Sequence, residues 1–189
     1  MSAFPFIPSL TLPSQVFASP AIAILVPITL GLAVGLANKP KNTKQVYAAI
    51  RQPPLRPPAS VFGPVWTILY GTMGYAAYRA TTSGLLNPDP EIRSLALAGT
   101  TAYTSQLVLN LVWMPLFFGL RKPALALADI VALTANVGSL AMLWGKWDPV
   151  AAYLMVPYLM WLGFATYITA GVGVLNNWDI SKLEEGKKD

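Results

Sequence analysis

The residues best suited to bind a ligand in this chain are aromatic and polar side chains that recur at helical spacing. Residues three or four positions apart share one face of a helix. Four segments carry such stripes: Phe62, Trp66 and Tyr70; Gln106, Asn110, Trp113 and Phe117; Asp129 and Asn136; and Tyr158, Trp161, Ala165 and Thr169. Aromatic rings offer stacking surfaces and a few polar groups fix orientation, so the stripes predict a pocket for a large, flat, mostly apolar ligand.

Ordinary packing between helices is an equally good interpretation of Trp66, Trp113 and Trp161 on spacing alone. Asp129 also has more than one interpretation, because no basic residue shares its apolar segment. It is protonated, bonded to a neighbouring helix or exposed to a wet cavity, and only the last arrangement would be functional.

Several kinds of chemistry are excluded by composition, because the chain has no Cys and no His. Disulfides, Cys/His zinc sites, thiol nucleophiles and a His general base cannot exist without these residues. No other nucleophile or acid–base constellation stands out. We therefore expect no metal site, no cofactor, and no ordinary hydrolytic or transfer catalysis.

The stripes lie in segments that are nearly free of charge. Of the Asp, Glu, Lys and Arg residues, only Asp129 falls inside one of five long apolar stretches, at 20–37, 57–78, 94–120, 123–145 and 149–178. A helix that crosses a hydrocarbon core of roughly 30 Å needs about 20 residues. The mean hydropathy of +0.51 leaves too little polar surface for a soluble domain. We expect an all-α membrane protein, a five-transmembrane-helix bundle with helices at about 20–37, 59–79, 94–119, 123–144 and 150–176.

One domain, at 20–178, is expected between two short flanks. Residues 1–19 lack a basic region and contain prolines, so they predict a disordered lead-in rather than a secretory signal or a transit peptide. The loop 38–56 ends in a proline cluster and predicts an ordered, extended lid rather than a further helix. Prolines inside three predicted spans should kink them: Pro27, Pro115 and Pro157.

Basic residues favour one orientation in the membrane. Ten of the 13 Lys and Arg residues fall in the loop 38–56, at 121–122 and in the tail 179–189, which share one side of a five-helix bundle. The positive-inside rule makes this side, and hence the tail, cytosolic. Such loops typically meet anionic headgroups, so we expect membrane lipid and no nucleic acid as a partner. Gly31 and Gly35 form a G-x-x-x-G pattern, which serves either close packing within the fold or a homodimer.

Three sequence blocks together carry a family resemblance. The first is Arg56-Pro-Pro-Ala-Ser-Val-Phe-Gly-Pro-Val-Trp-Thr-Ile-Leu-Tyr-Gly-Thr-Met-Gly-Tyr75. The second is Gln106-Leu-Val-Leu-Asn-Leu-Val-Trp-Met-Pro-Leu-Phe-Phe-Gly119 followed by Ala126-Leu-Ala-Asp129, and the third is Pro157-Tyr-Leu-Met-Trp161 followed by Phe164-Ala-Thr166. Over about 20–177 the chain resembles the translocator protein family, also called tryptophan-rich sensory proteins or peripheral-type benzodiazepine receptors.

The resemblance implies a five-helix membrane protein that binds porphyrins, sterols and synthetic isoquinoline or benzodiazepine ligands in a pocket closed by the first loop. Trp66 and Trp161 match the tryptophans implicated in porphyrin breakdown by bacterial members. Pocket-lining positions of the family match Tyr70, Asn110, Trp113, Ala128 and Ala165. Taken with the stripes, the expected ligand site comprises Phe62, Trp66, Tyr70, Asn110, Trp113, Ala128, Asp129, Tyr158, Trp161 and Ala165, with Arg51 and Arg56 of the lid reaching the ligand's propionates.

The chain also departs from the family pattern in ways that bear on the ligand. Leu55, within Gln52-Pro-Pro-Leu-Arg-Pro-Pro58, stands where the lid often has a tryptophan, so looser closure is expected. Leu125 replaces a pocket tryptophan of animal members, and their sterol-recognition stretch is absent, with Ala170, Gly171 and Val174 in its place. We therefore favour porphyrin over sterol, and metal-free porphyrin over haem, because the commonest axial ligands of haem iron are missing.

Three functions are compatible with these residues. The favoured one is binding of porphyrin or haem for transport or homeostasis. The alternatives are a porphyrin-degrading photo-oxidative enzyme that uses Trp66 and Trp161, and a membrane adaptor modulated by its ligand. We expect the mitochondrial outer membrane, with the endoplasmic reticulum and other secretory membranes as the alternative.

Overall fold

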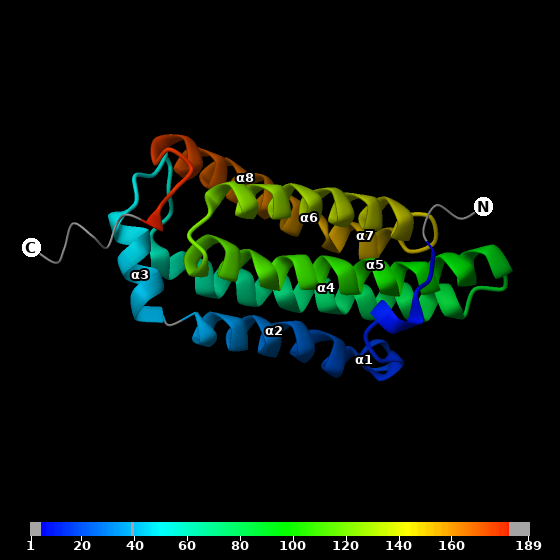
Figure 1. Cartoon of the computed structure of the whole chain (residues 1–189). Helices are drawn as coiled ribbons and strands as arrows, with labels where there is room; N and C mark the ends of the chain where they lie inside the picture. Colours follow the sequence, from blue (N-terminus) through cyan, green and yellow to red (C-terminus); the bar gives the residue numbers. More distant parts are fainter. Residues whose placement is uncertain (1–4, 39, 182–189) are drawn as a thin grey trace, which may run out of the picture.

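The computed structural model describes residues 5–38 and 40–181, which form helices and connections without a β-strand. Within these residues, long helical rods pack side by side (Figure 1). They are α2 (Pro20–Ala37), α4 (Phe62–Leu85), α5 (Pro90–Met114) with its π-helical continuation η3 (Pro115–Gly119), α6 (Pro123–Trp144), and α7 (Pro149–Leu154) followed by α8 (Val156–Leu175). The shorter elements are η1 (Pro8–Leu10), α1 (Ser14–Ala18), α3 (Pro40–Ala49) and η2 (Ala59–Val61). The all-α expectation is confirmed.

Three helical stretches in the described part of the chain are long and apolar enough to cross a membrane: α2, α6, and the α7–α8 rod taken as Pro149–Leu175. This is fewer than the five that the sequence predicts. The rods α4 and α5 have 24 and 25 residues but carry more polar side chains. Several of these are buried within the bundle, including Thr81 of α4 and Thr100, Gln106 and Asn110 of α5.

The helix starts follow from local chemistry. Proline occupies the first turn of α2, α5, α6 and α7, where its missing N–H costs no hydrogen bond. Asp89 caps α5 by accepting from the amide of Glu91 at 2.8 Å. Asp148 caps α7 through the amide of Ala151 and also accepts from Arg79 of α4, so it joins two rods.

Close packing between α2 and α4 depends on a glycine. A Cβ atom at Gly74 would lie 2.1 Å from the backbone oxygen of Ala23, so only glycine permits this approach. On the same helix, Met73, Ala76 and Ala80 have no exposed surface and belong to the hydrophobic core of the bundle.

The expectation of a disordered lead-in is wrong for residues 5–19; residues 1–4 lie outside the described residues. Phe17 of α1 is buried and its ring meets Tyr103 edge to face at 5.8 Å. The amide of Leu12 donates to Thr104 Oγ1 at 3.0 Å. The N-terminal elements therefore pack on the bundle, α1 against α4 and η1 against α5, which composition alone does not reveal. Of the expected tail, residues 182–189 lie outside the described part.

The expectation that the whole 38–56 loop is extended is also wrong, because Pro40–Ala49 forms α3. Proline at a first helical position favours a helix, and the proline cluster that disfavours one begins only at Pro53. The prolines predicted to kink the spans act differently from one another. Rod α2 runs through Pro27 without a break, α5 becomes π-helical at Pro115, and the α7–α8 rod is interrupted at Met155, two residues before Pro157.

Candidate functional site

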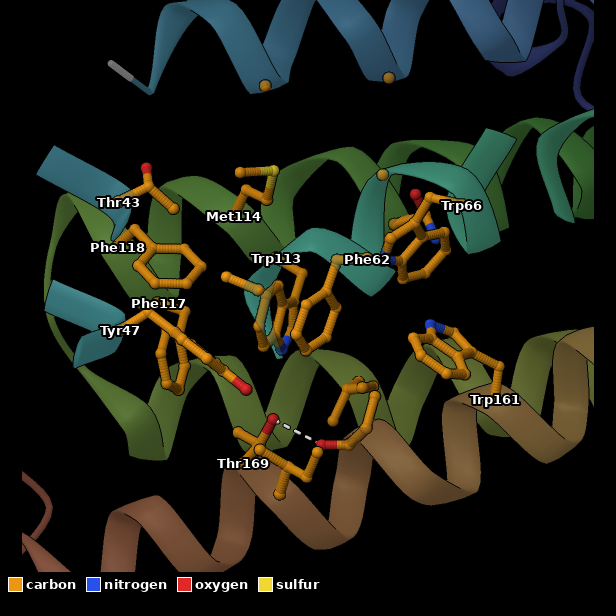
Figure 2. A pocket seen from close by; sticks show the side chains of 18 of the residues that line it. Thr43, Tyr47, Phe62, Trp66, Trp113, Met114, Phe117, Phe118, Trp161 and Thr169 are labelled. Carbon is orange, nitrogen blue, oxygen red and sulfur yellow. Dashed lines mark hydrogen bonds between the residues drawn. The ribbon is translucent and has the colours of Figure 1, made fainter. Parts of the chain in front are cut away.

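A cavity of about 400 Å³ lies between the rods (Figure 2). It is at the end of the bundle where α3 lies (Figure 1). Side chains of α2, α3, α4, α5 with η3, α6 and α8 all line it. The volume falls within the range typical of small-molecule sites. The walls are mainly apolar, as such sites require.

Aromatic rings from three rods form the walls of the cavity. Trp113 and Phe117 stack at 4.9 Å with an interplanar angle of 15°. Phe62 meets Trp161 edge to face at 5.8 Å (Figure 2). Trp66 lies against Tyr70 with ring centroids 5.4 Å apart. These rings offer flat faces and edges to a guest.

The π-helical turn η3 explains how Phe117 reaches this wall. Its wider turn is closed by the amide of Leu120, which donates to the backbone oxygen of Pro115 at 2.8 Å. Pro115 cannot donate a backbone hydrogen bond, and such local π-turns recur at functional sites. The turn leaves Phe117 buried and stacked on Trp113 rather than directed toward lipid.

Two residues of the cavity wall carry buried hydrogen-bond donors that have no partner among the described residues. Trp113 Nε1 and Trp161 Nε1 are both enclosed, and neither donates to another described group. Both residues line the cavity. A buried donor without an acceptor costs free energy, so these groups are suited to an acceptor that a ligand brings.

The floor of the cavity is polar. Tyr70 donates its hydroxyl proton to Asn110 Oδ1 at 2.6 Å, and Asn110 Nδ2 donates to the Tyr158 hydroxyl at 2.7 Å. Tyr158 in turn donates to Gln106 Oε1 at 3.2 Å. Tyr70 and Asn110 line the cavity, whereas Tyr158 and Gln106 are fully buried behind them.

The lid consists of α3 and the proline-rich segment that follows it. Tyr47 of α3 lines the cavity and donates to the backbone oxygen of Pro57 at 2.6 Å. Burial raises the pKa of the Tyr47 phenol, and the positive charge of Arg56 offsets part of this effect. Asn176, the C-cap of α8, anchors the other side of the lid through two hydrogen bonds to Arg51. Its Oδ1 accepts from the Arg51 amide, and its Nδ2 donates to the Arg51 carbonyl.

Most of the residues predicted for the site line this cavity: Phe62, Trp66, Tyr70, Asn110, Trp113, Trp161 and Ala165. Tyr158 is instead a supporting residue behind the floor. Asp129 is buried between helices outside the cavity, and its Oδ2 has no hydrogen-bond partner among the residues that the structure describes. Ala128 is exposed, because each residue turns a helix by about 100° and Ala128, two residues from the cavity-lining Ile130, therefore points to the opposite side of α6. The side chains of Arg51 and Arg56 are exposed and do not line the cavity.

Residues missed by sequence reasoning come from α3 and α2. Lys44, together with Thr43 and Tyr47, enters the lining because α3 is a helix. The four-residue spacing of Thr43 and Tyr47 was a usable signal for it. Gly31 and Gly35 also line the cavity, so the G-x-x-x-G face points inward, and Gly31 lies against the Tyr70 ring.

Comparison with known proteins agrees with this architecture. Residues 23–175 match the sequence model of the TspO/MBR family, which is most of the chain and includes four of the rods entirely. The chain belongs to the TspO/MBR family. It is therefore a protein of a membrane family, and its several apolar helices fit that setting.

Relatives in this family cover most of the chain. It is 45% identical over 155 residues to the translocator protein homolog of Schizosaccharomyces pombe, covering 82% of this chain and 90% of the relative. It is 35% identical over 147 residues to the human translocator protein, an alignment that covers 78% of this chain and 84% of the human protein. The chain is also 34% identical over 152 residues to the tryptophan-rich protein TspO of Chlorobaculum tepidum, an alignment that covers 79% of this chain and 92% of that relative. None of these names states a catalytic activity.

Proposed function

We propose that the chain is a five-span integral membrane protein that binds tetrapyrroles, porphyrin or haem, in the aromatic cavity and serves their transport or homeostasis. The observation that carries this proposal is a cavity walled by aromatic rings, two of which, Trp113 and Trp161, hold buried indole N–H groups without a partner among the described residues. Flat, conjugated ligands gain stacking free energy from such walls, and their peripheral polar groups supply acceptors.

The charged end of a tetrapyrrole has a matching group at the lid. Lys44 is the charged side chain among the described residues that line the cavity. Its ammonium group is long and flexible enough to meet a propionate at the membrane surface. Lys44 thus takes the role that the sequence assigned to Arg51 and Arg56. A sterol lacks a carboxylate for Lys44, and we rank it second as a ligand.

Protoporphyrin IX titration into the detergent-purified protein tests this proposal, with tryptophan quenching followed in the dark. We expect saturable binding that weakens when Trp161→Phe or Trp113→Phe removes an N–H donor, and weakens under Lys44→Gln when the porphyrin carries its propionates. The dimethyl ester of the porphyrin should bind equally to the parent protein and Lys44→Gln. Absence of saturable binding would overturn the tetrapyrrole assignment.

A second candidate function is photo-oxidative porphyrin breakdown. It is favoured by a cluster of oxidisable rings in which Trp66, a residue of the cavity wall, lies 5.4 Å from Tyr70 and 6.1 Å from Tyr158. The same titration under light decides between the two. Bleaching that is lost in the Trp66→Phe, Trp161→Phe double variant supports the enzyme, and binding without bleaching supports the carrier.

The five-span arrangement rests on length and charge. The 24 residues of α4 extend about 36 Å, more than the roughly 30 Å hydrocarbon core, and α5 is as long. The distribution of Lys and Arg favours a cytosolic C-terminus. We propose the mitochondrial outer membrane as its location. A homodimer would use a face other than Gly31 and Gly35, which line the cavity.

The lack of Cys makes the topology simple to test. Leu55 in the lid and Leu86 in the α4–α5 connection are strongly exposed, at 85% and 79%. Five spans put these positions on opposite sides of the membrane. In sealed vesicles an impermeant thiol reagent should label only one of the Leu55→Cys and Leu86→Cys variants, and labelling of both would contradict the arrangement.

A further inference from the structure

The hydrogen bonds behind the cavity floor form a continuous chain across three rods. They run from Tyr70 of α4 through Asn110 of α5 and Tyr158 of α8 to Gln106 of α5. Gln106 Nε2 then reaches Met73 Sδ of α4 at 3.8 Å. Only Tyr70 and Asn110 touch the cavity, so the rest of the chain acts on a ligand solely through them.

Met73 decides in which direction the protons of this chain point. A thioether accepts hydrogen bonds but has no proton to donate. The Gln106 side chain therefore turns its NH₂ group toward Met73 and its oxygen toward Tyr158. In the reverse orientation the Gln106 oxygen would face sulfur in a fully buried site and have no donor.

This direction passes from one residue to the next. Tyr158 donates its only hydroxyl proton to Gln106 and so can only accept from Asn110 Nδ2. Asn110 therefore turns its oxygen to Tyr70, which donates its own proton to that oxygen. The hydroxyl of Tyr70, a residue of the cavity wall, is then left with an oxygen lone pair and no free proton.

We propose that Tyr70 is a hydrogen-bond acceptor for the ligand, and that Gln106 and Met73 are positioning residues that impose this polarity from outside the cavity. The site then selects flat apolar ligands that present an N–H or O–H donor to Tyr70, in addition to an acceptor for the indole groups. The inference rests on the proposed binding cavity and names the chemical class that it prefers.

A matched pair of flat probes isolates this effect. 1-Pyrenemethanol carries an O–H donor, and its methyl ether, 1-(methoxymethyl)pyrene, keeps the oxygen but has no donor. Both are titrated into the detergent-purified protein by energy transfer from tryptophan to pyrene. We expect the alcohol to bind roughly fivefold more tightly than the ether, the typical effect of one additional hydrogen bond in a buried site.

Three variants then test the chain, with the alcohol-to-ether ratio as the readout because a general loss of packing would weaken both probes alike. Tyr70→Phe removes the acceptor and should bring the ratio to about one. Residue 106 does not line the cavity, yet Gln106→Leu removes the acceptor of the Tyr158 proton. Tyr158 can then donate to Asn110, whose side-chain amide turns over and directs its NH₂ group to Tyr70. The Tyr70 proton is then free to be donated to a ligand. This variant should bring the ratio to one or below. Met73→Leu, a volume-conserving change, should lower the ratio without unfolding the protein.

Tyr103→Phe serves as the matched control. Its hydroxyl is buried on α5 like the amide of Gln106, but it has no hydrogen-bond partner in the described structure and lies outside the chain. The parent ratio should persist in this variant. A ratio near one in the parent protein, or a fivefold ratio that survives Gln106→Leu and Met73→Leu, would overturn the inference.

Protoporphyrin IX in the same titrations separates this inference from the proposed function. Saturable porphyrin binding with a pyrene ratio near one leaves the tetrapyrrole assignment standing and overturns the polarity of Tyr70. A fivefold ratio that depends on Gln106, without porphyrin binding, supports the polarity and overturns the tetrapyrrole assignment. No binding of any of the three probes overturns both.

Discussion

Replacement of Gly31 by alanine should damage the cavity although it adds only one methyl group. A Cβ atom at this position would lie 2.2 Å from Cε2 of Tyr70 and 2.7 Å from Cζ. Carbon atoms in contact prefer about 3.5–4.0 Å, so the ring must retreat by about 1.3 Å or α2 must move outward. Either movement alters the wall that Tyr70 forms beside Trp66.

The cost follows from the bonds that Tyr70 makes. Its hydroxyl lies 2.6 Å from Asn110 Oδ1, and such a bond does not survive a shift of more than about 1 Å. Overpacking costs about 1–3 kcal/mol and the lost hydrogen bond about 1 kcal/mol. Alanine returns about 1 kcal/mol through helix propensity, so Gly31→Ala should lower the free energy of unfolding by about 1–3 kcal/mol.

Gly35→Ala is the matched control, because Gly35 lies one turn further along α2 and also lines the cavity. A Cβ atom added there would have no described atom within 4 Å apart from the nearby backbone of α2 itself. It should be neutral or stabilising by up to about 1 kcal/mol. Unfolding in mixed detergent micelles measures both variants, and protoporphyrin IX titration should show at least roughly fivefold weaker binding for Gly31→Ala alone. Equal stability and equal affinity of the two variants would refute the packing of Gly31 on Tyr70.

Two further predictions concern the lid and the tail. Gly171→Ala would place a Cβ atom 2.6 Å from Pro53 Cγ, so this variant should displace the lid. Stopped-flow experiments should then show porphyrin dissociation about fivefold faster. Gly163→Ala is the control, because the space around Gly163 is open, and it should leave the dissociation rate unchanged. The Asp179 carboxylate accepts from the hydroxyl and amide of Ser181, which lowers its pKa from 3.8 to about 2. A lowered pKa stabilises the folded tail above the ordinary pKa, so the Ser181 amide resonance should shift as the pH falls from about 4 to 2 and stay constant in Asp179→Asn.

Several residues of the cavity wall could be chosen from the sequence, because the periodicity of a helix links residue spacing directly to shared direction. Phe62, Trp66 and Tyr70 fall on one face of α4 and all line the cavity. Asn110 and Trp113 do the same on α5. These predictions required only that the segments be helical and that their polar and aromatic faces turn away from lipid.

Predictions failed where the side chain's partner lies on a different rod. Tyr158 shares the α8 stripe with Trp161, yet Asn110 and Gln106 of α5 hold it behind the floor. Asp129 is buried as expected of a polar residue in a span, but the rotation of α6 directs it away from the cavity. No spacing rule within one helix reports how that helix is rotated against its neighbours.

The sequence by itself determined that the chain is helical, rich in membrane-compatible segments and related to the TspO/MBR family, because hydropathy, periodicity and motifs are properties of neighbouring residues. The tertiary structure decided that α3 supplies Lys44 to the lid, that Gly31 faces Tyr70, and that Met73 ends the chain of hydrogen bonds. Each of these depends on distances between residues far apart in sequence. Such distances are set by the packing of whole rods, where many small contacts add up and no local pattern records the outcome.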